Sequence, residues 1–168
     1  MRPSPNYLID YLHLMPHLEG GYFREAYRAT GSIPRKVLPT GFTGDRNFST
    51  AIYFLLEKGD FSAFHRIRSD ECWHFYEGGT LLIHVIAENG RYQCIRLGRN
   101  LQKGDVFQVV VPAGAWFASE PAEGSAFSLV GCTVAPGFDF EDFEMAKGQS
   151  LAENFPDHHT LIRRLCRY

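Results

Sequence analysis

The segment from Gly59 to Gly78 constrains the fold of this chain more than any other stretch. Its first half alternates like a β-strand, and one face carries Phe61, Ala63, His65 and Ile67. In its second half, one strand face carries Glu71, Trp73, Phe75 and Glu77. A polar turn at residues 68–70 separates the halves, so we expect the two strands to form a hairpin. The Gly78-Gly79 pair closes this hairpin and allows unusual backbone angles. The imidazole of His65 and the carboxylate of Glu71 would then lie diagonally on one face, roughly 7–8 Å apart.

Short strands are predicted along most of the remaining chain, at residues 48–56, 80–87, 91–97, 106–111, 116–119 and 126–134. The Asn89-Gly90 pair is typical of a tight hairpin turn between two of them. Helices are predicted at residues 4–14, with Ser4 as the N-cap, and at 139–147 and 154–167. Residues 29–47 form a long loop of the kind that often covers a site. Eight or more short strands between terminal helices predict a mainly β barrel or double sheet.

The composition favours a single domain, residues 1–168, with a small-molecule pocket. The 14 Phe and 8 Tyr residues suggest a barrel or pocket lined with rings. The formal net charge is only −2, with both signs interspersed, so neither nucleic acid nor membrane is expected as a partner. The four cysteines lack a C-x-x-C pair, and no signal peptide is evident, so we expect reduced thiols in a cytoplasmic protein.

The spacing of Gly59, His65, Glu71 and Gly78 resembles the first motif of the cupin superfamily, with Ile67 in place of the second histidine. The region from Gly104 to Pro121 resembles the second motif more loosely, and Phe117 stands at the histidine position. Further stretches are similar to the cupin-5 branch, a domain of unknown function, at residues 17–25, 49–56, 65–74, 109–116 and 134–143. The resemblance, from about residue 7 to about 165, implies a jelly-roll barrel that is a homodimer, and it implies no particular reaction.

The resemblance leaves His65 and Glu71 as the candidate catalytic residues, either as an acid/base pair or as metal ligands. The alternative is a buried hydrogen bond that only joins two strands. A catalytic metal needs about three protein ligands, and neither Ile67 nor Phe117 coordinates metal. The candidates for a third ligand are His74, His84 and Tyr53, although simple alternation places His74 on the opposite strand face from Glu71. The sequence therefore predicts no definite cofactor. A divalent metal held by His65 and Glu71 is the alternative to a metal-free site.

Metal-free cupin epimerases and ketoisomerases are similar in having a histidine on a barrel strand among aromatic walls. The rings predicted to hold a ligand are Tyr22, Tyr53, Trp73, Phe75, Trp116 and Phe117. Arginines are candidates to meet phosphate at positions 24, 28 and 66. The first hypothesis is an isomerase or epimerase acting on a sugar or nucleotide sugar. The rival hypotheses are a non-catalytic binding module and a metal-dependent dioxygenase or isomerase. Residues 19–21 are predicted to form a tight turn rather than a loop lining the mouth.

Overall fold

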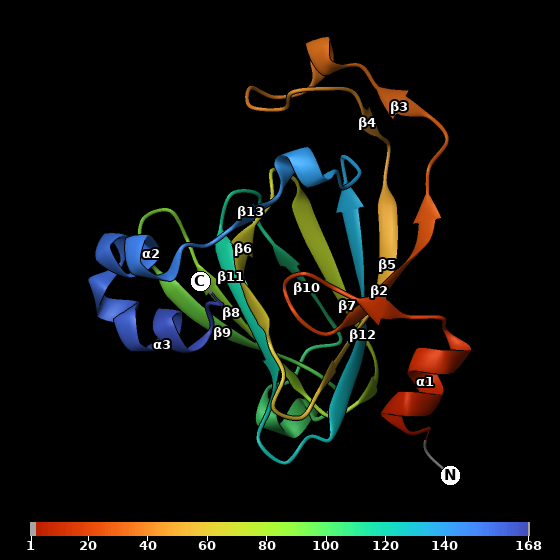
Figure 1. The fold of residues 1–168 in the computed structure, drawn as a ribbon, viewed down its shortest axis with the longest axis vertical. Coiled ribbons are helices and arrows are strands. Elements are labelled where there is room, and N and C mark those ends of the chain that lie inside the picture. Colours follow the sequence, from red (N-terminus) through yellow and green to blue (C-terminus); the bar gives the residue numbers. More distant parts are fainter. Residues whose placement is uncertain (1–2, 168) are drawn as a thin grey trace.

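The computed structural model describes residues 3–167, which form two facing β-sheets with helices packed outside them (Figure 1). The helices are α1 (Pro5–Tyr11), α2 (Gly148–Asn154) and α3 (His159–Arg164), with short 3-10 turns η1 (Arg35–Val37), η2 (Leu101–Lys103), η3 (Phe140–Asp142) and η4 (Pro156–His158). The strands are β1 (Met15–Pro16), β2 (Tyr22–Arg28), β3 (Ser32–Ile33), β4 (Arg46–Asn47), β5 (Thr50–Glu57), β6 (Ser62–Arg66), β7 (Asp70–Gly78), β8 (Leu81–Ile86), β9 (Tyr92–Leu97), β10 (Gln108–Val111), β11 (Trp116–Pro121), β12 (Phe127–Ala135) and β13 (Glu144–Met145).

The two main sheets are antiparallel and together make the double-stranded barrel of a jelly roll. One has six strands in the order β1-β2-β5-β12-β7-β10, and the other has five in the order β13-β6-β11-β8-β9. Strands β3 and β4 form a separate small ribbon within residues 29–47. Each sheet buries one face against the other. Strands β5 and β8 are apolar on both faces, because α1 covers Leu55 of β5 and helices α2 and α3 cover Ile86 of β8 from outside.

The strands of the 59–78 segment do not pair with each other, so the expected hairpin is wrong. Strand β6 pairs with β11 and β13, whereas β7 pairs with β12 and β10 in the opposite sheet. Alternation along a strand specifies which residues share a face, but it does not specify the neighbouring strand. His65 and Glu71 therefore reach the barrel interior from two different sheets.

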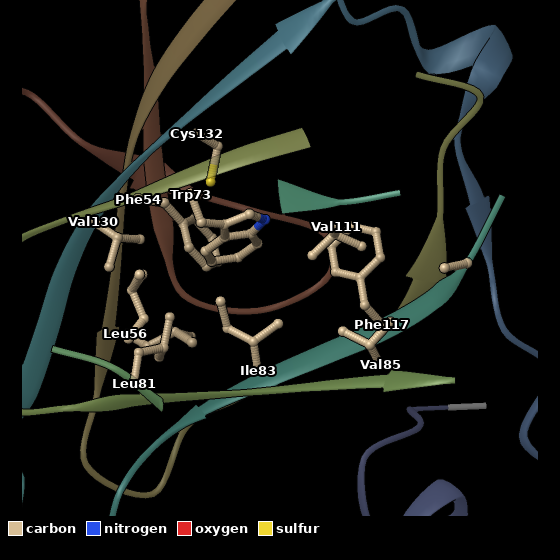
Figure 2. Close-up of a cluster of buried hydrophobic side chains, with 12 residues drawn as sticks. Phe54, Leu56, Trp73, Leu81, Ile83, Val85, Val111, Phe117, Val130 and Cys132 are labelled. Carbon is tan, nitrogen blue, oxygen red and sulfur yellow. The ribbon is translucent and has the colours of Figure 1, made fainter. Parts of the chain in front are cut away.

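Apolar side chains fill one part of the space between the sheets (Figure 2). Phe54 meets Trp73 edge-to-face with ring centroids 6.0 Å apart, and Trp73 meets Phe117 in the same way at 6.2 Å. Ile83 is also fully buried in this cluster. Cys132 belongs to the same cluster, and it also lines the cavity described below. Apolar side chains therefore fill the barrel interior at one end only, and a cavity remains at the other.

The helices cover the outer faces of the barrel. Leu8 of α1 packs with Leu55, and the side chains of α2 and α3 pack against Phe64 on the outer face of β6. The predicted N-cap is confirmed, since the Ser4 Oγ accepts a hydrogen bond from the Tyr7 backbone N–H.

The helix predicted at residues 139–147 is wrong. Only the turn η3 forms there, and it is followed by β13. The segment is extended because it pairs with β6 as an added strand, opposite His65 and with a hydrogen bond to the Phe64 carbonyl. Gly148, predicted to end that helix, instead begins α2. The Asn89-Gly90 hairpin joins β8 and β9 as predicted, with Gly90 at φ +80°. All four cysteines are free thiols, as predicted.

Candidate functional site

A cavity of about 240 Å³ lies between the two sheets at the end of the barrel where β5 and β7 begin and β2 and β12 end. The segment from Phe138 to Phe143 and the loop of residues 29–47 both lie at this end of the barrel (Figure 1). His65 and Glu71 both line the cavity. The structure thus brings the two predicted chemical groups to one enclosed space.

The nearest acidic partner of His65 is Glu19, which the sequence interpretation assigned only to a tight turn. Glu19 Oε2 lies 3.1 Å from His65 Nε2, and both side chains are buried. The Glu19 carbonyl accepts a hydrogen bond from the Ala63 backbone N–H at 2.8 Å, which fixes the loop along β6. A side chain at Gly20 would collide with the Phe61 carbonyl, and Gly20 has φ +118°. The turn is therefore also the element that delivers Glu19 into the cavity.

The hydrogen bonds of His65 determine where its proton lies. Its Nδ1 is 2.7 Å from the Ala63 carbonyl, which can only accept, so Nδ1 carries the hydrogen and Nε2 is free to accept. Burial lowers the pKa of His65 and raises the pKa of Glu19 to about 7. Near neutral pH, the proton between them therefore lies mainly on Glu19, whose O–H donates to Nε2.

His17 extends the same cluster. Its Nδ1 accepts a hydrogen bond from the Glu19 backbone N–H at 3.3 Å and lies 3.6 Å from Glu19 Oε2. Burial lowers the pKa of His17, so this imidazole is neutral as well. The sequence could have indicated this group, because a histidine and a glutamate precede two adjacent glycines at residues 17–21. Such glycines allow a tight turn that can carry the two side chains into a site.

Glu71 is the second acidic group of the cavity, and it lies on the opposite sheet. It is 8% exposed and makes no ion pair within the described residues. Burial raises its pKa to about 7, against smaller opposing effects of His65, the Cys132 thiol and the Trp73 indole. The Trp73 Nε1 has no full hydrogen-bond partner among the described residues, and its effect on the Glu71 pKa is the smallest of these.

The rings that enclose the cavity differ from those predicted. Phe143 stacks on His65 at 5.2 Å between ring centroids, and Phe23, Phe138 and Phe140 complete the aromatic lining. The six rings predicted to hold a ligand all lie outside this lining. Trp73, Phe75 and Phe117 pack in the apolar core; Tyr22 and Tyr53 pack near α1; Trp116 packs towards α2 and α3. For the three core rings, strand alternation gave the inward direction without showing which inward positions meet open space. Any ligand contact by these six rings stays a prediction.

The candidate third metal ligands lie away from the cavity. The extra residue of the bulge in β7 falls at Tyr76, so alternation is unbroken from Glu71 to His74, which faces outward and meets Thr133 Oγ1 at 3.2 Å. His84 lies on the outer face of the other sheet and contacts Tyr92 and Glu120. Tyr53 is also on an outer face, against Tyr76.

The residues present do not fit the metal centre that the cupin motifs imply. Ile67 and Phe117 occupy two ligand positions, and the Nε2 of His65 is paired with Glu19. Across residues 3–167, no group of three or more His, Cys, Asp or Glu side chains is arranged to hold a metal ion.

Of the three arginines considered for phosphate, only Arg28 lines the cavity. Arg66 pairs with Glu144 and lies over the Trp116 ring, and Arg24 lies over the Tyr53 ring. The two adjacent histidines near the C-terminus also lie elsewhere, with His158 Nε2 bonded to the Gly90 carbonyl.

The fold and site define a cupin-type barrel with a small polar cavity. Residues 6–146 match the family described as Cupin superfamily (DUF985), and the chain belongs to that family. It is 32% identical over 151 residues to the uncharacterized protein YML079W of Saccharomyces cerevisiae, covering 84% of this chain and 75% of that one. Within the described chain, every helix is too short or too polar to cross a membrane.

Two solved structures are similar over nearly the whole chain. A hypothetical protein from Leishmania major is 32% identical with a TM-score of 0.89, covering 99% of this chain and 100% of that one. Protein SO0799 from Shewanella oneidensis is 36% identical with a TM-score of 0.88, covering 99% of each. Oxalate decarboxylase from Bacillus subtilis shares only the fold, at 17% identity and a TM-score of 0.54 over 89% of this chain and 36% of that one.

The buried Glu71 carboxyl should make stability depend on pH in a predictable direction. Its pKa of about 7 in the folded protein exceeds the unfolded value of about 4.5, so the folded state binds the extra proton between these pH values. The stabilisation from this group is complete below about pH 4.5 and is lost as the pH rises through 7. Glu71→Gln should therefore gain roughly 2–3 kcal/mol relative to wild type between pH 5 and pH 8.

Urea unfolding of both proteins across this pH range measures that difference. The buried histidines, whose pKa values are lowered, act in the opposite direction in both proteins and largely cancel in the comparison. A constant difference in unfolding free energy from pH 5 to pH 8 would show that the carboxyl of Glu71 is not held protonated by burial.

Proposed function

We propose that the protein is a small-molecule isomerase or epimerase in which His65 and Glu71 move a proton at a carbon next to a carbonyl. The observation that supports this most is the placement of His65, whose Nε2 lies 3.1 Å from Glu19 Oε2, on one sheet and of the Glu71 carboxyl group on the other, with both lining one cavity. A substrate in the cavity between them would meet an acid/base group on each side.

In the proposed cycle, Glu19 is ionised and His65 Nε2 accepts the proton of the substrate carbon. The electron pair of the broken C–H bond forms the enolate, and the Glu19 carboxylate stabilises the new imidazolium. Glu71, in its protonated form, then donates its proton to the opposite face of that carbon or to its neighbour. Return of the proton from His65 to Glu71 through solvent restores the starting state.

The pKa values of the two carboxyl groups suit this exchange. Burial raises the pKa of Glu19 and that of Glu71 to about 7, so each is present in both forms at neutral pH. General acid–base groups are most effective when their pKa lies near the working pH. The aromatic lining also excludes water from the enolate.

Exchange of substrate hydrogen with solvent tests this proposal without knowledge of the product. Small aldoses, ketoses and amino sugars are incubated with the protein in D₂O, and the NMR signal of the hydrogen next to the carbonyl is followed. At least one compound should lose this signal faster than in a protein-free control. Absence of exchange across the panel would contradict the proposal.

A non-catalytic binding module is the second candidate. It is favoured by the fact that both ring nitrogens of His65 have partners inside the protein, as in a purely structural histidine. Compounds that shift protein NMR signals on binding and yet undergo no exchange would favour this candidate over catalysis.

A further inference from the structure

The ionisable groups lining the cavity, the histidines apart, are mostly acidic. They comprise one arginine, Arg28, and four carboxyl groups, those of Glu19, Glu25, Glu71 and Asp139. The two histidines are neutral, because burial lowers the pKa of each. An anionic ligand would therefore enter a space in which negative potential outweighs positive.

Arg28 has no free hydrogen-bonding edge for an anion. Its Nε and Nη2 bind the two Glu25 oxygens at 2.9 and 2.7 Å. Its Nη1 binds Asn47 Oδ1 at 2.8 Å and the Phe138 carbonyl at 3.1 Å. The guanidinium is thus neutralised by Glu25 and used to hold the mouth together, so a phosphate would have to displace Glu25.

Glu71, by contrast, has no cationic partner among the described residues. It is more than nine-tenths buried and lines the cavity, and none of the ion pairs among residues 3–167 involves it. The Cys132 thiol and the Trp73 indole lie beside Glu71, but neither carries a positive charge. A cationic ligand is therefore the natural partner for the ionised form of this buried carboxyl group.

The aromatic lining suits the same kind of ligand. Phe138, Phe140 and Phe143 pack edge-to-face against one another at 5.0 to 6.3 Å between centroids, and Phe23 of β2 also lines the cavity. The faces of such rings attract ammonium groups.

We propose that the cavity takes a small molecule carrying a protonated amine, such as an amino sugar, and that Glu71 pairs with this amine. This inference rests on the proposed function for the location of the site. With an amine bound, Glu71 is ionised, so solvent supplies the returning proton in the proposed cycle. The inference replaces the phosphate-bearing substrates suggested by the arginine content. The cavity of about 240 Å³ is also smaller than the roughly 300–1,000 Å³ of drug-sized sites, which suits a single ring better than a nucleotide sugar.

Binding of matched probes by calorimetry tests the charge preference. One set is cyclohexylamine, cyclohexanol and cyclohexanecarboxylate, and the other is glucosamine, glucose and glucuronate. The amine in at least one set should bind about tenfold or more tightly than its neutral and anionic counterparts. At pH 6.5, its binding should also release a proton, because an ammonium group favours the ionised form of Glu71. Equal affinities within each set, or tightest binding of the carboxylates, would overturn the inference.

Two variants show whether the stated residues cause the preference. Glu71→Gln, which keeps the shape of the side chain, should remove the preference for the amine and the proton release. Glu25→Gln frees Arg28 at the mouth and should raise the affinity of the carboxylate probes. Retention of the amine preference in Glu71→Gln would assign it to another group and overturn the pairing.

The outcomes separate this inference from the proposed reaction. Preferential amine binding without hydrogen exchange would leave the binding inference standing and would remove the isomerase proposal. Hydrogen exchange on uncharged sugars, with no preference for amines, would do the reverse.

Discussion

His65→Gln should lower the rate of enzyme-dependent hydrogen exchange by roughly 10²- to 10⁴-fold, the usual contribution of a positioned general base. Glutamine can still accept a hydrogen bond from protonated Glu19, but its amide cannot take up a proton at neutral pH. The rate of signal loss in D₂O measures the effect on any compound that the wild-type protein exchanges.

The chain contains a matched control for this variant. His84 is also buried, and its Nε2 also lies 3.1 Å from a carboxylate oxygen, that of Glu120, but it faces the outside of the barrel. His84→Gln should therefore leave the exchange rate unchanged. An exchange rate that survives His65→Gln, or falls equally in both variants, would show that His65 is not the base.

The pH profile of the same reaction carries a second readout. The proposed cycle needs ionised Glu19 and protonated Glu71, both with pKa values of about 7. The rate should therefore fall on both the acidic and the alkaline side of neutrality. In Glu71→Gln, where solvent must supply the returning proton, the alkaline fall should disappear.

Arg46→Ala should lower the free energy of unfolding by about 3 kcal/mol, because the buried Asp142 carboxylate would keep only the more distant Arg68, whose Nε lies 3.8 Å from Asp142 Oδ1. The Arg46 Nε and Nη2 bind the two Asp142 oxygens at 2.6 and 2.9 Å, and both side chains are almost fully buried. This pair joins the loop of residues 29–47 to the segment that carries Phe140 and Phe143 at the cavity. Denaturant unfolding monitored by fluorescence measures the loss.

Two further variants distinguish the buried charge from simple loss of packing. The double variant Arg46→Met with Asp142→Leu should recover most of the lost stability, since it removes both charges together. Arg66→Ala, which breaks the exposed pair with Glu144, should cost only about 1 kcal/mol. If Arg46→Ala costs no more than Arg66→Ala, the pair contributes little to fixing the cavity wall.

Local pattern predicted the elements of the fold well where each element depends on its own residues. Alternation located the strands, and Asn89-Gly90 and Ser4 marked a turn and a helix start. The helix expected at 139–147 was wrong because β6 offered hydrogen bonds to that segment, which is a property of a distant strand.

The candidate site shows the same division between local and distant information. The spacing of His65 and Glu71 marks both as inward-facing residues of a cupin barrel, because side-chain direction along a strand is local. That β6 and β7 lie in opposite sheets, and that the turn at Gly20-Gly21 brings Glu19 to His65, depends on contacts between residues far apart in sequence. The amino-acid sequence alone thus determined that His65 and Glu71 point into the barrel. Only the tertiary structure decided which groups meet and which rings surround open space, because those facts depend on strand partners and packing that no local pattern encodes.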